Sequence, residues 1–179
     1  MNREVVMRRV RYAVAASLDG FIAGPKGEAD WILMDPEIDF KAIIAQYDTM
    51  LVGRKTFEAM GAQGGGGGWG MKTYVFSRTL RQADHKGVTI VGEEAAETVA
   101  ALRKEEGKDI WLFGGGSLFR SLADEGLVDT VEVAVVPVVL GGGIPLVEAR
   151  FAPLELRLTG HRVYRETGIV SLEYAVGRR

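Results

Sequence analysis

WLFGGGSLF, residues 111–119, combines a short apolar run, three consecutive glycines and the start of a helical pattern. The apolar run has the length of a buried strand, and Leu118, Leu122 and Ala123 recur on one side of a helix. Free N–H groups at a helix start attract an anion, and glycines let a flat or charged ligand approach the backbone. The stretch therefore predicts a strand, a glycine turn and a helix that can hold an anion. A tight turn without a ligand is the alternative.

The composition is typical of one globular domain spanning residues 1–179, because 47% of the 179 residues are hydrophobic and 26% are charged. The formal net charge of -2 provides no basic field for a nucleic acid backbone. The chain has no cysteine, and His85 and His161 stand far apart, so the sequence predicts neither a disulfide nor a metal site. It shows no membrane-spanning run and no signal peptide, so a cytoplasmic protein is expected.

The order of the predicted elements indicates an α/β fold. Hydrophobic periodicity predicts strands at residues 10–16, 50–52, 73–76, 88–91, 110–113, 130–138, 154–164 and 169–176. It predicts helices at residues 36–47, 53–60 and 93–106, and one more between the glycine turn and Gly126. Strands alternate with helices at first, and strands alone follow. This order predicts a three-layer α/β/α architecture, in which a mixed, mostly parallel sheet ends in an antiparallel C-terminal hairpin.

A second glycine-rich segment, residues 61–70, contains five consecutive glycines and predicts a mobile loop. Gly65, Gly67 and Gly70 match the dinucleotide-binding pattern G-x-G-x-x-G in a formal sense. The match does not stand between a strand and a helix, and a run of glycines satisfies the pattern by chance. We therefore assign it no role in nucleotide binding.

Three predicted turns carry groups that suit phosphates. Arg54, Lys55 and Thr56 follow a strand and Gly53, and Ser77 and Arg78 follow the next strand, whereas the glycine turn supplies bare backbone. Because the carboxyl ends of parallel strands meet at one edge of a sheet, we expect the three turns to lie together. Such an edge suits a ligand with several phosphates, and the cations favour NADP over NAD.

Five segments in register resemble the dihydrofolate reductase-like superfamily. They are VAASLDGFIA at 14–23, LVGRKTFE at 51–58, VFSR at 75–78, LFGGG at 112–116 and VLGGGIPL at 139–146. Within the superfamily, the chain resembles the reductase domain of riboflavin biosynthesis, the RibD C-terminal domain type, from about residue 8 to residue 176. The resemblance implies a dihydrofolate reductase-like fold and an NADPH-dependent reductase that is often a homodimer.

The resemblance also implies a cofactor site. Ala15 and Ile22 would flank the nicotinamide, and Ser77 and Arg78 would lie near the 2′-phosphate of the adenosine. The remaining cofactor-binding residues that it implies are Gly53, Arg54, Lys55 and Thr56 for phosphates, and Gly114, Gly115, Gly116, Ser117 and Leu118 for the pyrophosphate. In this superfamily one peptide bond between these glycines is commonly cis, and we expect it between Gly115 and Gly116.

The catalytic acid is less well defined. The classical folate enzyme carries an acid at the start of its first long helix, and Glu37 and Asp39 bracket that place here. Asp19 lies in a loop that would close over the site, with Gly20 and Gly24 as pivots. Hydride would pass from C4 of the nicotinamide to an electrophilic carbon of a heterocycle or of its opened sugar. Either acid of the pair, or a water molecule, would deliver the proton.

Three functions remain open from the sequence. The first is reduction of 5-amino-6-(5-phosphoribosylamino)uracil, as in riboflavin biosynthesis, although no clear set of basic residues for a ribosyl phosphate stands out. The second is reduction of dihydrofolate. The third is a module that binds a nucleotide or dimerises without catalysis.

Overall fold

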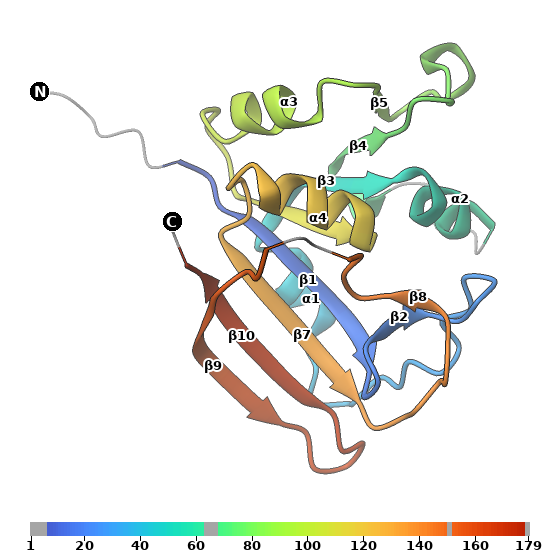
Figure 1. Cartoon of the computed structure of the whole chain (residues 1–179), viewed down its shortest axis with the longest axis vertical. Helices are drawn as coiled ribbons and strands as arrows, with labels where there is room; N and C mark the ends of the chain where they lie inside the picture. The colour runs from blue at the N-terminus through green and yellow to red at the C-terminus, as the bar shows by residue number, and fades with distance from the viewer. Residues whose placement is uncertain (1–6, 63–67, 150–151, 178–179) are drawn as a thin grey trace, which may run out of the picture.

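The computed structural model describes residues 7–62, 68–149 and 152–177, and an eight-stranded sheet forms its centre (Figure 1). In spatial order the strands are β5 (Thr89–Val91), β4 (Lys72–Phe76), β3 (Tyr47–Gly53), β6 (Asp109–Gly114), β1 (Val10–Ser17), β7 (Thr130–Val136), β10 (Val170–Val176) and β9 (Leu156–Val163). The strands from β5 to β7 are parallel to their neighbours, whereas β10 is antiparallel to both β7 and β9. The predicted mixed, mostly parallel sheet with an antiparallel C-terminal hairpin is confirmed.

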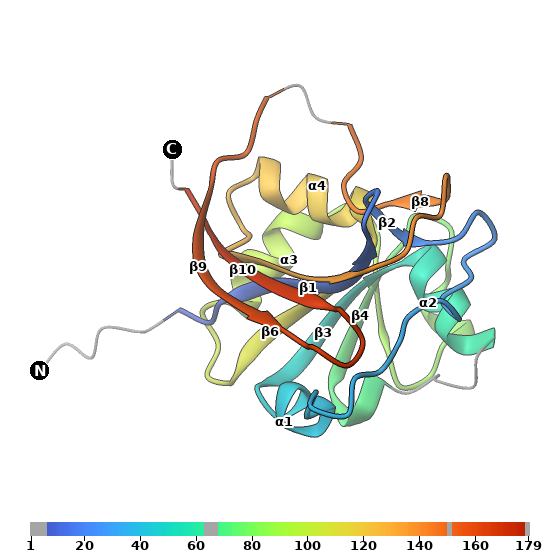
Figure 2. The same ribbon diagram turned by 90° about the horizontal axis from the view of Figure 1, so that it is seen from below.

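Two helices, α3 (Ala95–Leu102) and α4 (Gly116–Asp124), cover one face of the sheet (Figure 2). The ring of Tyr12 in β1 stacks on that of Phe119 in α4, with 4.2 Å between the ring centroids. Burial of one large apolar side chain stabilises the fold by about 1.5–3 kcal/mol. The main buried residues of this face are Val10, Tyr12, Leu51, Val99, Leu102, Ile110, Leu112, Phe119 and Leu122.

The opposite face is covered by α2 (Arg54–Ala62) and by the short helix α1 (Phe40–Ile44), which Figure 2 shows below the sheet. Successive residues of a strand point to opposite faces. Leu51 lies in the core beneath α3 and α4, whereas its neighbours Met50 and Val52 pack with Phe57 and Met60 of α2. The sheet is therefore the middle layer of three, as the sequence predicts.

The helix predicted at residues 36–47 is mostly a loop, and only Phe40–Ile44 is helical. The Asp35 carboxylate accepts a hydrogen bond from the Glu37 N–H at 2.9 Å and so turns the chain before a helix can form. The Asp39 carboxylate then caps α1 by accepting a hydrogen bond from the Ala42 N–H at 2.9 Å. The prediction is wrong here because side chains of aspartate compete with the helix for backbone N–H groups.

Other element boundaries differ by a few residues. The strand predicted at residues 50–52 is β3 and begins at Tyr47, which is buried. The helix predicted at residues 93–106 is α3 and covers only Ala95–Leu102. Of the loop expected at residues 61–70, positions 63–67 lie outside the described residues, and Gly68–Gly70 forms the 3-10 helix η1. A further 3-10 helix, η2, covers Gln82–Asp84.

Two short segments outside the predicted strands pair with each other. β2 (Phe21–Ala23) and β8 (Ile144–Pro145) form a small antiparallel sheet beside the carboxyl end of β1 (Figure 1). The Leu146 N–H also donates to the Gly20 carbonyl at 2.8 Å. This pairing brings the loop after β1 and the loop after β7 together at one end of the sheet.

Candidate functional site

The turns singled out by the sequence leave the same edge of the sheet. β3 lies between β4 and β6, and all three strands are parallel. At their carboxyl ends Gly53 is paired with Phe76, and Val52 is paired with Gly114. We call the edge formed by the ends of β1, β3, β4 and β6 the carboxyl rim. The segments that begin at Gly53, Ser77 and the glycine turn all leave this rim.

Close contacts join two of these turns. A Cβ atom added to Gly53 would lie 3.6 Å from the Gly115 nitrogen, so the two backbones are nearly in contact. A Cβ atom on Gly115 would lie 3.5 Å from Thr56 Oγ1 and 4.0 Å from Ile22 Cδ1. The bare backbone of the glycine turn therefore faces a hydroxyl from α2 and an apolar side chain from β2. These four predicted cofactor-binding residues lie together.

The glycine turn itself contains a cis peptide bond, which joins Gly114 to Gly115. The expected position between Gly115 and Gly116 is wrong by one residue. Gly116 is the first residue of α4, and its backbone is fixed by the helix and by the carbonyls of Pro145 and Leu146 beside it. The chain reverses earlier, where Gly114 adopts a φ of +155° that favours glycine.

The start of α4 has the properties of an anion site. Gly115 is the N-cap, and no side chain caps the helix. The Phe119 N–H is the first to bond back into the turn, to the Gly115 carbonyl at 3.0 Å. The N–H groups of Gly116, Ser117 and Leu118 precede it, and the first N–H groups of a helix have no acceptor within the helix. These groups point out of the carboxyl rim together with the positive end of the helix dipole.

The cations at the carboxyl rim differ in how they are engaged. Arg54 pairs with Glu58 one turn along α2 at 2.9 Å, and both side chains are partly exposed. Lys55 and Arg78 are exposed and form no ion pair with any of the described residues. Ser77 is buried, and its Oγ accepts hydrogen bonds from the N–H groups of Thr79 and Leu80. Ser77 thus holds the turn that presents Arg78 to solvent.

At the opposite, amino end of the strands, arginines are paired with carboxylates. Arg11 pairs with Glu132 at 2.7 Å, and Arg103 pairs with Asp129 at 2.9 Å. Arg8 is buried and pairs with Asp48. Buried ion pairs of this kind fix the structure, since removal of one partner leaves an uncompensated charge. The unpaired cations at the carboxyl rim are those that remain free to bind an external anion.

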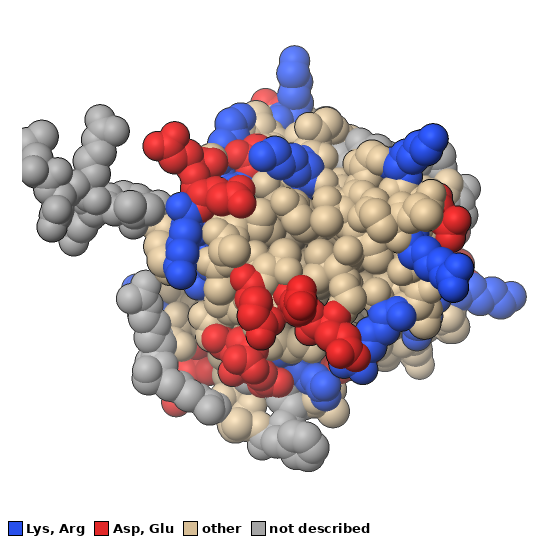
Figure 3. Space-filling model, turned by 90° about the horizontal axis from the view of Figure 1, so that it is seen from above, with Lys and Arg blue, Asp and Glu red and all other residues tan. Residues whose placement is uncertain are grey.

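Surface charge does not form a single-sign field on the face shown in Figure 3. Asp and Glu side chains gather below an uncharged centre and at the upper left, and Lys and Arg side chains lie around these groups. On this face of the described residues, the distribution gives no reason to expect a polyanion such as a nucleic acid.

The acid predicted in the loop after β1, Asp19, ties two loops together. Its carboxylate accepts hydrogen bonds from Ser17 Oγ at 2.7 Å, the Leu140 N–H at 3.1 Å and the Gly141 N–H at 2.8 Å. These hydrogen bonds, that from Ser17 above all, lower the pKa of Asp19. A carboxylate held ionised in this way joins the loop after β1 to the loop after β7.

The two other predicted acids also have partners. Glu37 pairs with Arg162 of β9 at 2.8 Å, and both side chains are more than half exposed. β9 is separated from β6 by β1, β7 and β10, so the structure does not bring Glu37 to the glycine turn. Asp39 caps α1 through the Ala42 N–H. Neither carboxylate is positioned as the sequence reasoning expected of a catalytic acid.

Sequence reasoning missed the acid that is most enclosed in this region. Asp35 is only 2% exposed, and no other aspartate or glutamate among the described residues is buried. Its carboxylate accepts hydrogen bonds from the Glu37 N–H at 2.9 Å, from Thr167 Oγ1 at 2.7 Å and from the Thr167 N–H at 3.2 Å. Asp35 therefore joins the loop before α1 to the turn between β9 and β10. The only local signal is its place before Pro36, which is typical of a turn.

We expect Asp35→Asn to lower the Tm at neutral pH. Burial by itself raises the pKa of Asp35, but the hydrogen bonds from Thr167 and Glu37 outweigh it and lower the pKa. A lowered pKa means that the ionised carboxylate stabilises the fold above its unfolded pKa of about 3.9, and that this contribution is lost as the pH falls through the folded value. Wild type should lose Tm as the pH falls below the unfolded pKa and through the lowered folded pKa of Asp35, and Asp35→Asn should lose less. Thermal unfolding at neutral and acidic pH measures both effects.

The control is Asp30→Asn, at an exposed aspartate of the same loop. Equal pH profiles of Tm for Asp30→Asn and Asp35→Asn would contradict the stabilising role of the Asp35 carboxylate.

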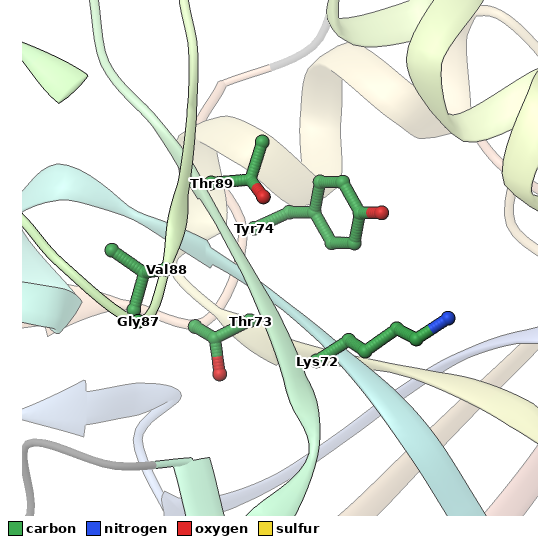
Figure 4. A pocket seen from close by; sticks show the side chains of 6 residues that line it. All are labelled: Lys72, Thr73, Tyr74, Gly87, Val88 and Thr89. Atoms are coloured by element: carbon green, nitrogen blue, oxygen red, sulfur yellow. The ribbon is translucent and has the colours of Figure 1, made fainter.

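A surface hollow of the described residues lies away from the carboxyl rim. It has a volume of about 210 Å³ and is lined by Lys72, Thr73, Tyr74, Gly87, Val88 and Thr89 (Figure 4). These residues lie at the amino ends of β4 and β5, where Tyr74 is paired with Thr89. The hollow contains none of the predicted site residues and is smaller than a typical ligand pocket of about 300–1,000 Å³. The glycine turn, and not this hollow, is the candidate site.

The part of the chain that the structure describes contains no group of His, Asp and Glu side chains that could hold a metal ion. Nor does any helix within the described ranges have the length and apolar character needed to cross a membrane.

Known proteins resemble this chain in both sequence and fold. Uncharacterized protein YyaP of Bacillus subtilis (strain 168) is 36% identical over 195 residues, with 97% of this chain and 98% of that protein covered. Dihydrofolate reductase type 1 of Escherichia coli is 31% identical over 144 residues, with 79% of this chain and 84% of that protein covered.

Two solved structures have similar folds. The structure of a putative riboflavin biosynthesis protein from Shewanella sp. PV-4 has a TM-score of 0.81 at 24% identity, covering 96% of this chain and all of the other (100%). Dihydrofolate reductase from Enterococcus faecalis, complexed with NADP(H) and RAB-propyl, has a TM-score of 0.71 at 20% identity, covering 95% and 97% of the two chains. The fold is dihydrofolate reductase-like.

The model of the RibD C-terminal domain matches residues 8–170, which include β1, the glycine turn and β9. With a match over most of its length and a relative at 36% identity, the chain belongs to the RibD C-terminal domain family.

Proposed function

We propose that residues 1–179 form a single NADPH-dependent reductase domain that transfers a hydride to a pyrimidine- or pteridine-type heterocycle. Homologues in this family and among dihydrofolate reductases are reductases of the riboflavin and folate type, which supports an oxidoreductase. The observation that carries the proposal is the glycine turn, which lies against Gly53, Thr56 and Ile22 at the carboxyl rim.

The residues at the rim fit a dinucleotide. The pyrophosphate would lie on the N–H groups at the start of α4, because they lack acceptors in the helix and face the rim. Gly114 leaves a space that a Cβ atom would fill, 3.4 Å from Thr56 Oγ1, so the hydroxyl and the backbone can contact the same phosphate group. Arg78, presented by Ser77, would hold the 2′-phosphate, and Lys55 would add charge nearby.

The chain positions the reactants, while the reduced nicotinamide supplies the hydride when bound. Ala15 of β1 and Ile22 of β2 would lie on either side of the nicotinamide, where their small or apolar side chains leave room and exclude water. Asp19, Asp35 and Asp39 are each hydrogen-bonded within the chain, and Glu37 is ion-paired at the surface. We therefore assign proton delivery to a water molecule and not to one of these carboxylates.

Three candidate functions fit the site: reduction of either of two substrates, or binding of a nucleotide without catalysis. Family membership favours 5-amino-6-(5-phosphoribosylamino)uracil, and the relative at 31% identity, a dihydrofolate reductase, keeps dihydrofolate as the second candidate. The two acids that bracket the start of α1 are both engaged, Glu37 by Arg162 and Asp39 by the Ala42 N–H, which weighs against the folate reaction. A module that only binds nucleotide is the third candidate.

The test is the loss of NADPH absorbance when the purified protein is mixed with each substrate in turn. We expect NADPH to bind and to be oxidised by the ribosylaminouracil. Oxidation with dihydrofolate alone would identify the second candidate. Binding of NADPH without oxidation by either compound would identify the non-catalytic module, and failure to bind NADPH would overturn the proposal.

We also propose that two copies of the chain associate through β9. This strand is at the edge of the sheet, and Leu156, Leu158 and Val163 are 42%, 50% and 55% exposed. A long edge strand with apolar side chains is a template for pairing with another strand. Two antiparallel β9 strands would satisfy this edge in a symmetric dimer.

Leu158→Asp should convert the dimer to a monomer with little change in Tm, because the side chain is already half exposed in one chain. Light scattering at several protein concentrations measures the mass. Leu18→Asp, at a 67% exposed leucine in the loop after β1, is the matched control and should remain dimeric. A monomeric wild type would contradict the proposed interface.

A further inference from the structure

Trp69 has an unusual backbone conformation. Its φ of 48° is the only positive value at a non-glycine residue among the described residues, and it stands between Gly68 and Gly70. Large side chains rarely adopt this left-handed region. Backbone conformations of this kind persist only where the surroundings hold them, and they gather at functional sites.

Aromatic rings hold the Trp69 side chain in place. Its indole stacks on that of Trp111, with 5.6 Å between centroids and 20° between planes. Phe113 and Phe40 contact it edge to face at 5.4 Å and 5.8 Å. Trp111 is itself fixed, because its indole N–H donates to the Ala13 carbonyl at 2.9 Å and Tyr47 stacks on it at 5.0 Å. Trp69 is the outermost member of this cluster.

The indole of Trp69 remains accessible. Trp69 is 46% exposed, whereas Trp111 beneath it is only 4% exposed. A ring that stacks on a buried neighbour through one face leaves its other face to solvent. An aromatic side chain that is both immobilised and half exposed offers a rigid, flat, apolar surface.

This surface lies on the strand that leads to the glycine turn. Trp111 and Phe113 occupy alternate positions of β6, so they point to the same face of the sheet, and Phe113 directly precedes Gly114. On the neighbouring strand β1, Arg11 is paired with Trp111, so Ala13 and Ala15 lie on that same face. Ala13 and Ala15 are small and only half-buried, so the large rings on β6 share a face of the sheet with Ala15 of the proposed nicotinamide site.

We propose that Trp69, supported by Phe113, is the stacking surface for the planar ring of the substrate, and that it acts as a positioning residue. The inference rests on the proposed reductase function and adds to it the residue that orients the ring of the substrate. Stacked aromatic rings attract one another through an offset arrangement of their π-systems, beyond the burial of apolar area. The cluster offers rings and no charged group to the ligand, so it selects for planarity more than for charge.

The test uses pterin, an unreduced flat heterocycle, as the probe and isothermal titration calorimetry on the full chain with NADP⁺ present. Trp69→Leu should weaken pterin binding by roughly 10- to 100-fold, the range expected for loss of one stacked ring. Trp69→Phe keeps an aromatic ring and should retain affinity within about threefold. The Kd for NADPH should be unchanged in both variants, since the cofactor contacts lie at the glycine turn.

A second measurement covers the case in which Trp69→Leu does not fold. Stacking of pterin on Trp69 should quench the tryptophan emission of wild type, and Trp69→Phe, which keeps Trp31 and Trp111, should lose most of this quenching. Equal pterin affinity in folded wild type and Trp69→Leu, or failure of wild type to bind pterin, would overturn the inference. Failure of wild type to bind NADPH would instead overturn the proposed function. The pterin affinities of wild type and Trp69→Leu would still show whether Trp69 stacks on the ring.

Discussion

Replacing Gly116 with alanine should destabilise the protein by about 2–3 kcal/mol, the cost expected when an added methyl group forces the backbone to move. A Cβ atom at this position would lie 2.9 Å from the Pro145 carbonyl oxygen, 3.1 Å from that of Leu146 and 3.2 Å from the Glu148 nitrogen. All three atoms belong to backbone, so no side-chain rotation can relieve the contact. Either α4 or residues 145–148 must shift, and both shape the carboxyl rim.

Thermal and urea unfolding measure this effect. For a chain of this size the Tm should fall by roughly 4–12 °C, taking 2–4 °C for each kcal/mol. NADPH affinity should fall as well, because the displaced start of α4 carries the N–H groups assigned to the pyrophosphate. Gly116→Ala therefore affects fold and site together and needs a partner variant that separates them.

Gly115→Ala is that partner. Its Cβ atom would contact Thr56 Oγ1 at 3.5 Å and Ile22 Cδ1 at 4.0 Å, which are ordinary van der Waals distances, and the φ of −104° suits alanine. The Tm should stay close to that of wild type. The methyl group would stand on the surface where the dinucleotide approaches, so the Kd for NADPH should rise about tenfold or more, equivalent to about 1.4 kcal/mol. Wild-type affinity in Gly115→Ala would remove the glycine turn from the cofactor site.

The features that local sequence encodes were predictable. The run of residues 110–113 and the glycines after it specify β6, the turn and α4, since strand length, backbone freedom and helix periodicity change abruptly within a few residues. The C-terminal hairpin follows in the same way from alternation on both sides of the turn at Gly168, whose φ is +75°. Neither prediction depends on contacts between distant segments.

The features that failed depend on such contacts. Ile38 and Ile43 have helical spacing, but Ile38 reaches its apolar cluster from a loop, because Asp35 and Asp39 bind nearby N–H groups. The short strands β2 and β8 were not predicted as strands, because the partner of each lies more than 120 residues away along the chain. Hydrophobic periodicity over a window of about 11–18 residues shows neither the hydrogen bonds of the two aspartates nor the pairing of β2 with β8.

The acids of the candidate site illustrate the same limit. Asp19 bonds to Leu140 and Gly141, Asp35 bonds to Thr167, and Glu37 pairs with Arg162. Each carboxylate meets its partner across more than 120 residues of sequence. Position near a predicted helix start suggested catalysis, whereas each of these carboxylates also joins its loop to a distant part of the chain.

Arg78→Ala should weaken NADPH binding by about 10- to 100-fold and NADH binding by less than about threefold, because a charge-assisted contact to phosphate contributes about 1.5–3 kcal/mol. Arg78 is exposed at the end of β4 and forms no ion pair with the described residues, so its guanidinium is available to the ligand. The neighbouring Ser77 is buried and fixes the turn, which limits the entropy lost when the arginine binds.

Arg81→Ala is the matched control, since Arg81 is an equally exposed cation three residues further on, at the N-cap of η2 rather than at a strand end. Fluorescence titration measures the Kd for NADPH and the Kd for NADH, in wild type and in each variant. The two nucleotides differ only in the 2′-phosphate. The ratio of the Kd for NADH to the Kd for NADPH is therefore insensitive to general damage to the fold or to the glycine turn.

A fall in this ratio for Arg78→Ala, but not for Arg81→Ala, would place the 2′-phosphate beside β4. Equal losses for NADPH and NADH would mean that Arg78 contacts a part that both nucleotides share. The proposed preference for NADPH would then have to come from Lys55 or Arg54.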